Sequence, residues 1–123
     1  MRERLSNAKL LLVLVGAYTR FQHKFVKWEI EIALKDGIPI IVANINGKRK
    51  HDDDRCPAIL DNELAVHVPF KAKILQYAFD HWPTRHATRK KNGDKFPIFY
   101  KDSVYEDLGL IQRRSARATL LGR

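Results

Sequence analysis

Residues 9–45 read KLLLVLVGAYTRFQHKFVKWEIEIALKDGIPIIVANI, with two apolar segments on either side of an amphipathic one. The first apolar segment, Leu10–Val15, has no alternation of apolar and polar residues, which is typical of a strand covered on both faces. A helix is predicted from about Arg20 to Asp36, and Gly37 ends it because glycine adopts the left-handed conformation at low cost. The second apolar segment, 38–45, predicts another strand. Strand, helix and strand in this order predict a parallel pair joined by a right-handed crossover.

One carboxylate lies among the apolar residues of the predicted helix. On a helical wheel the apolar arc consists of Phe25, Val26, Ile30, Ile32, Ala33 and Leu34. Glu29 falls inside this arc, where a buried carboxylate without partners is costly. Two interpretations stay open. Either Glu29 serves a functional site, or it leans out near the helix start to pair with a lysine or to cap the loop.

Length and composition indicate one ordinary globular domain. The chain has 123 residues, of which 45% are hydrophobic and 30% charged. The single cysteine, Cys56, excludes an internal disulfide framework and a multi-cysteine zinc site. No apolar run is long enough to cross a membrane, and no signal-peptide apolar region is present at the N-terminus. We therefore expect a cytoplasmic protein without a membrane partner.

The formal net charge of +9 raises the question of an acidic partner. The basic residues cluster in two places, namely Arg85, Arg89, Lys90, Lys91 and Lys95, and Arg113, Arg114, Arg117 and Arg123. Such clusters can contact the phosphates of nucleic acids. We prefer a solvated loop and a basic tail, because the aromatic residues that single-strand binders place between basic ones are absent there.

The loop at 44–57 carries opposite charges next to a histidine. Asp52–Asp54 follow His51, but successive side chains in a loop seldom converge on a hard cation, so no metal site is predicted. Asn44 lies near a strand end, where a polar side chain can reach a ligand or form a turn. A third strand is predicted over Leu64–Val68, and its His67 is interpreted as a structural histidine.

Residues 71–82 are ambiguous between helix and strand. Leu75, Ala78, Phe79 and Trp82 make an apolar face if the segment is helical, whereas Leu75, Tyr77 and Phe79 alternate with polar residues if it is a strand. The strand would pair with residues 96–100 across a basic loop, 84–95. The C-terminal region beyond is expected to be irregular and basic.

The segments LLLVLVGAYTRF and KFVKWEIEIALKDGIPIIVANI resemble the third strand, the following helix and the fourth strand of Toll/interleukin-1 receptor (TIR) domains. The similarity is greatest to the bacterial TIR-like proteins of the Thoeris anti-phage system. It implies an α/β, flavodoxin-like TIR-type parallel sheet flanked by helices. It also implies one TIR-like domain over 1–123, with a core at 9–69 and a C-terminal extension at 70–123. By this resemblance the chain lacks the N-terminal part of a full TIR domain. It favours the strand interpretation of 71–82.

The resemblance further implies a site and an activity. Glu29 occupies the position of the glutamate that cleaves NAD⁺ in the active members, and the product would be an ADP-ribose-type signal in anti-phage defence. NAD⁺ is then the substrate, with no further cofactor and no metal. The residues expected to bind it are Gly16, Tyr18, Phe21, Phe25, Trp28 and Asn44. Many members have tryptophan where this chain has Phe25.

Two other functions remain alternatives. A TIR-like interaction module would act without catalysis, by self-association or by contact with a TIR or effector partner, because an open sheet edge pairs readily. A basic nucleic-acid-binding protein is the third alternative. It ranks last because no groove-reading motif is present.

Overall fold

The computed structural model describes residues 10–16, 24–50 and 55–111. The elements in these ranges follow one another as strands, helices and one short 3₁₀ helix. They are β1 (Leu11–Val15), α2 (Lys24–Asp36), β2 (Ile40–Asn44), η2 (Ala58–Leu60), β3 (Ala65–Pro69), α3 (Ala72–Lys91), β4 (Pro97–Phe99) and α4 (Asp102–Asp107).

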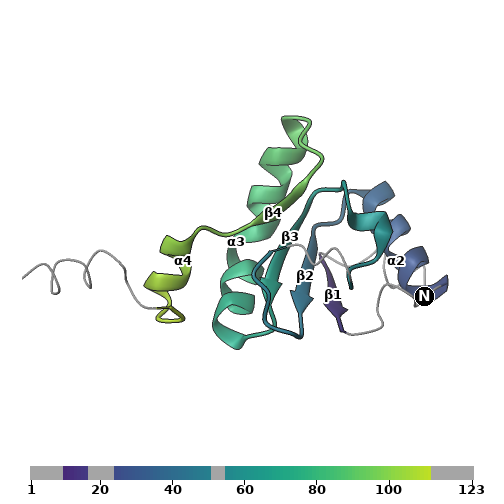
Figure 1. Cartoon of the computed structure of the whole chain (residues 1–123). Helices are drawn as coiled ribbons and strands as arrows, with labels where there is room; N and C mark the ends of the chain where they lie inside the picture. The colour runs from purple at the N-terminus through teal and green to yellow at the C-terminus, as the bar shows by residue number, and fades with distance from the viewer. Residues whose placement is uncertain (1–9, 17–23, 51–54, 112–123) are drawn as a thin grey trace, which may run out of the picture.

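The four strands form one parallel sheet in the order β1-β2-β3-β4 (Figure 1). Leu11 pairs with Ile40, Ile41 pairs with Val66, and Val66 pairs with Ile98. Each crossover places a helix or a loop on a face of the sheet, as parallel connections require. The predicted strands at 10–15, 38–45 and 64–68 are confirmed within two residues at each end, and so is their parallel pairing.

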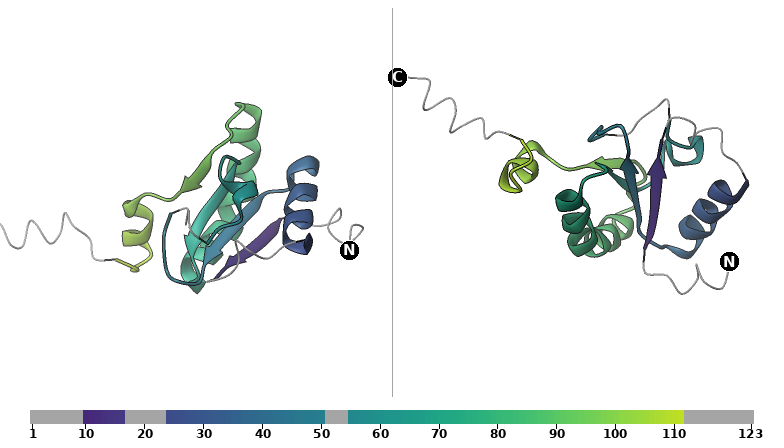
Figure 2. Two further views of the ribbon diagram at one scale, coloured as in Figure 1. Left: turned by 45° about the vertical axis from the view of Figure 1, so that its right-hand side comes forward. Right: turned by 90° about the horizontal axis from the view of Figure 1, so that it is seen from below.

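Helices cover both faces of the sheet (Figure 2). On one face, α2 and η2 pack on Val13, Val15, Ile40 and Val42 through Ile30, Ile32, Ala33 and Leu60. On the other face, α3 and α4 pack on Ile41, Val66 and Val68 through Ile74, Ala78, Trp82 and Tyr105. The result is the predicted α/β, flavodoxin-like arrangement with a parallel sheet between helices.

The helix before β2 ends where the sequence indicates. Gly37 has φ +73°, and the Ile38 amide donates to the Ala33 carbonyl at 2.9 Å, which closes the last turn of α2. The predicted start of this helix, near Arg20, lies outside the described residues.

The region after residue 70 corrects one expectation. Residues 72–91 form a single helix, α3, so the strand interpretation of 71–82 is wrong and most of the expected basic loop is helical. Ile74, Ala78 and Trp82 recur at intervals of four and are fully buried, and this apolar stripe decides in favour of the helix. The short strand β4 pairs with β3 and not with residues 71–82. The region up to residue 107 is therefore more regular than expected.

Candidate functional site at the β1 edge

Glu29 lies on the side of α2 that faces β1. Its helix neighbours Ile30 and Ala33 are fully buried against the sheet, whereas Glu29 itself is half-buried. A small hollow of about 110 Å³ is lined by Glu29 and Ile30 of α2 and by residues 11–14 of β1. The carboxylate therefore borders an apolar hollow at the edge strand, as its place in the apolar arc indicated.

Within the described residues, no hydrogen bond or ion pair joins the Glu29 side chain to another residue. This observation concerns the two interpretations of Glu29, as a functional carboxylate or as a side chain that leans out of the helix. A pairing with a lysine is not found in this part of the chain, and the loop that Glu29 could cap lies outside the described residues. A half-buried carboxylate beside apolar walls interacts more strongly with a developing positive charge than one in open water.

The edge of the sheet beside Glu29 is open in the described part of the chain. There β1 pairs with β2 only, and Leu12 and Leu14, on the face opposite α2, are 36% and 47% exposed. An unpaired strand edge flanked by apolar side chains favours the addition of another strand. The hollow is also far smaller than the roughly 300–1,000 Å³ typical of ligand pockets, so a further element is needed to enclose a substrate.

The other predicted ligand residues are only partly placed. Gly16 is half-buried immediately after β1, and Trp28 is 39% exposed next to Glu29 in the chain. Tyr18, Phe21 and the side chain of Phe25 lie outside the described residues. Their part in a site stays a prediction.

Asn44 is buried at the end of β2, in register with Val15 of β1. Its side-chain nitrogen donates to the carbonyl oxygens of Lys48, at 2.9 Å, and Lys50, at 2.8 Å. The donors of this amide are thus used to hold the following loop, and no sequence pattern indicated these bonds. A ligand role for Asn44 stays a prediction that would have to use its Oδ1 atom, which is buried and makes no hydrogen bond to a described residue.

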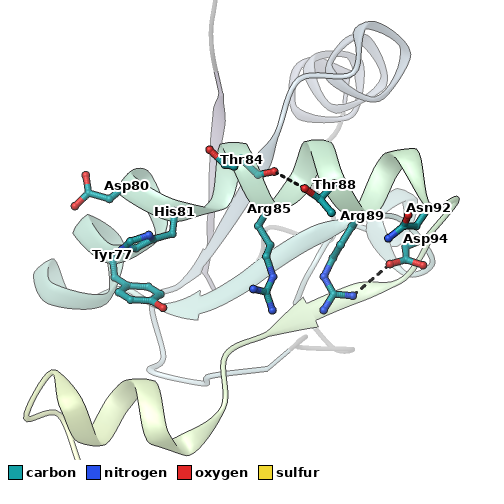
Figure 3. A pocket seen from close by; sticks show the side chains of 9 residues that line it. All are labelled: Tyr77, Asp80, His81, Thr84, Arg85, Thr88, Arg89, Asn92 and Asp94. Atoms are coloured by element: carbon teal, nitrogen blue, oxygen red, sulfur yellow. Dashed lines mark hydrogen bonds and ion pairs between the residues drawn. The ribbon is translucent and has the colours of Figure 1, made fainter.

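A larger groove on α3 was missed by sequence reasoning. It measures about 670 Å³ and its lining comes from α3 and the turn after it, namely Tyr77, Asp80, His81, Thr84, Arg85, Thr88, Arg89, Asn92 and Asp94 (Figure 3). Burial raises the pKa of the nearby Tyr100 hydroxyl, with Tyr77 and Tyr105 acting in the same direction and Arg85 opposing them. The spacing of Tyr77, His81, Arg85 and Arg89 by four could have revealed this face, had the segment been assigned as a helix.

Metal and membrane sites are not found in the part of the chain that the structure describes. No group of three or more histidine, cysteine or acidic side chains is arranged to hold a metal ion there. No helix among these residues has the length and apolar character needed to span a membrane.

A parallel sheet flanked by helices, with a glutamate on the helix that follows its edge strand, is consistent with the TIR fold. Residues 1–50 match the family model of the Thoeris protein ThsB, TIR-like domain, a range that contains β1, α2 and β2. Fold and match together support a Thoeris TIR-like domain, and with it a defence-related TIR-like protein. A comparison with curated proteins gives no match.

Proposed function

We propose that this chain is an NAD⁺ hydrolase or cyclase that breaks the nicotinamide–ribose bond, with Glu29 as the catalytic carboxylate. The observation that carries the proposal is the half-buried Glu29, which borders an apolar hollow and makes no hydrogen bond or ion pair within the described residues. The match over residues 1–50 adds support, because it includes Glu29 and the strand that faces it.

The proposed chemistry requires one carboxylate. The C1′–N bond breaks, its electron pair leaves with nicotinamide, and positive charge develops on the ribose as an oxocarbenium ion. A carboxylate beside C1′ stabilises that charge, as in glycoside hydrolysis. The nicotinamide ring is cationic in NAD⁺ and leaves as a neutral molecule, so no general acid is needed. Water then attacks C1′ and releases a proton in the hydrolase, whereas a nitrogen of the adenine attacks in the cyclase.

The proposed site is completed from outside the described residues. The 110 Å³ hollow cannot enclose a nicotinamide and a ribose, so the remaining walls must come from another segment or from a second copy added at the β1 edge. In the proposal, Tyr18, Phe21, Phe25 and Trp28 offer aromatic faces to the nicotinamide or adenine, and Gly16 and Asn44 border the same end of the sheet. NAD⁺ is the substrate, without metal or cofactor.

The product would be an ADP-ribose-type signal released in anti-phage defence. This step rests on the Thoeris relationship and on the chemistry above. The test is to incubate the purified protein with NAD⁺ at increasing protein concentrations and to measure free nicotinamide by chromatography. We expect the rate per molecule to rise with protein concentration, because assembly completes the site. Absence of nicotinamide release throughout the concentration series would contradict the proposal.

A second candidate, a non-catalytic interaction module, is favoured by Leu12 and Leu14. These exposed side chains lie on a strand whose outer edge is unpaired among the described residues. A strand from a partner could add to this edge, with backbone hydrogen bonds providing affinity and the leucines providing an apolar contact. Self-association without nicotinamide release would favour this candidate.

A further inference from the structure

The groove on α3 brings an aromatic end and a basic end onto one side of the helix. Tyr77, His81, Arg85 and Arg89 follow one another at intervals of four residues, which places them in a row along the helix. In Figure 3 the side chains of Tyr77, Arg85 and Arg89 point from α3 toward β4. The row therefore carries two aromatic rings at its N-terminal end and two guanidinium groups at its C-terminal end.

The charges of the groove leave one guanidinium available. Asp94 Oδ2 lies 3.3 Å from Arg89 Nη1, so these two side chains neutralise each other in part. Asp80 Oδ1 accepts a hydrogen bond at 3.0 Å from Nε2 of Gln76, which does not line the groove. In the described part of the chain, Arg85 lies between these pairs with no ion pair of its own.

The aromatic end is ordered by ring contacts. The Tyr77 ring centroid lies 4.4 Å from that of His81 and 5.0 Å from that of Tyr100, which meets it edge-on. These contacts fix the tyrosine without a bound ligand, and a fixed aromatic ring loses little entropy when another ring packs on it. Tyr77 and Arg85 are eight residues apart, about 12 Å along a helix at 1.5 Å per residue.

We propose that this groove binds a nucleotide, with its phosphates on Arg85 and its base against Tyr77 and His81. A guanidinium matches the geometry of phosphate oxygens through paired N–H donors, and nucleobases stack on aromatic side chains. The roughly 12 Å separation fits the distance from base to terminal phosphate of a nucleoside diphosphate. The groove is also much larger than the Glu29 hollow, at about 670 Å³ against 110 Å³.

This inference is independent of NAD⁺ cleavage. The groove is on α3, whereas Glu29 is on α2, and the two helices cover opposite faces of the sheet (Figure 2). Binding at the groove is therefore expected to be the same in the wild-type protein and in Glu29→Gln.

The test uses ADP as the probe and calorimetric titration of the full chain. We expect Arg85→Ala to raise the dissociation constant of ADP about tenfold, since hydrogen bonds to charged groups are the stronger ones. Arg85→Lys keeps the charge but not the paired donors and should recover only part of the affinity. Lys91→Ala removes the same charge from an exposed position of α3 outside the groove and should change the constant less than twofold.

Three further ligands complete the test. Adenosine and inorganic phosphate should each bind more weakly than ADP if the base and the phosphates are both recognised. A single-stranded oligonucleotide that binds more tightly than ADP, with equal losses in Arg85→Ala and Lys91→Ala, would show diffuse attraction and overturn the inference. Undetectable ADP binding by the folded wild-type protein would overturn it as well.

Discussion

The side-chain amide of Asn44 donates a hydrogen bond to the carbonyl oxygen of Lys50, with nitrogen and oxygen 2.8 Å apart. A second bond from the same nitrogen reaches the Lys48 carbonyl at 2.9 Å. Asn44 ends β2 next to Val15 of the edge strand, so this side chain ties the loop after β2 to the end of the sheet near the candidate site. The shape of that end therefore depends on one buried amide.

Substitution of Asn44 should destabilise the fold. Asn44→Ala removes both bonds and is expected to lower the free energy of unfolding by about 2 kcal/mol. Asn44→Asp should lower it by about 3 kcal/mol, because a buried carboxylate would face two carbonyl oxygens that it cannot donate to. Urea denaturation measures both values. Asn62→Ala, at an exposed position, is the control and should stay within about 0.5 kcal/mol of wild type. Equal stability of all three variants would contradict the role of Asn44.

A side chain at Gly37 should destabilise the fold. Its φ of +73° disfavours residues with a β-carbon, and a β-carbon there would collide with Lys90 Nζ. We expect Gly37→Ala to lower the free energy of unfolding by about 1 kcal/mol or more.

Gly47→Ala provides the matched control, since Gly47 has φ +86° and nothing within 4 Å of the added carbon. Because the exposed Lys90 side chain can move aside, both substitutions should lower the free energy of unfolding by similar amounts, set by the positive φ. A loss at Gly37 much larger than at Gly47 would show that Lys90 cannot move aside.

Acid should weaken the packing around His86. Burial against the core, with a smaller contribution from Lys90, lowers the pKa of His86 below its ordinary 6.5. The folded protein then binds fewer protons at this site than the unfolded chain, so stability is lost as the pH falls through about 6.5.

The measurement for His86 is the difference in free energy of unfolding between pH 7.5 and pH 5.5. His86→Phe keeps a ring against Trp82, whose centroid lies 5.7 Å from that of His86, and should reduce this difference. Lys90→Gln should reduce it to a smaller extent. A pH dependence that is identical in wild type and His86→Phe would assign the effect to other groups.

The β1 edge should mediate self-association. Leu14→Lys places a charge on an exposed side chain of the edge strand, which natural proteins use to block strand addition. We expect its free energy of unfolding to change by less than about 0.5 kcal/mol. In sedimentation experiments the variant should remain monomeric at concentrations where the wild-type protein associates. Equal association of the two proteins would exclude this part of the edge from the contact.

The first half of the fold was predictable because its signals are local. Leu10–Val15 and residues 38–45 are apolar runs with a glycine-terminated helix between them, and tertiary packing agrees with each of these signals. Residues 71–82 stayed ambiguous because Leu75, Tyr77 and Phe79 imitate the alternation of a strand, and the family resemblance favoured the strand. The burial of Ile74, Ala78 and Trp82 against the sheet decides in favour of the helix.

The candidate site was predictable only in part. The wheel identified Glu29 because a charge in an apolar arc is visible in the sequence alone. The bonds of Asn44 and the row of Tyr77, Arg85 and Arg89 depend on a loop conformation and on a helix assignment, which no local pattern determines. A groove formed by one helix and the turn after it becomes visible only when that helix is known.

The most direct test compares Glu29→Gln with Glu31→Gln in the nicotinamide-release assay at a protein concentration where the wild type is active. Glu31 is an exposed glutamate on the same helix, so both variants lose one negative charge and only Glu29 borders the hollow. We expect Glu29→Gln to lower the rate at least a hundredfold, whereas the rate of Glu31→Gln should stay within about twofold of wild type. Equal rates for Glu29→Gln and the wild-type protein would exclude Glu29 from catalysis.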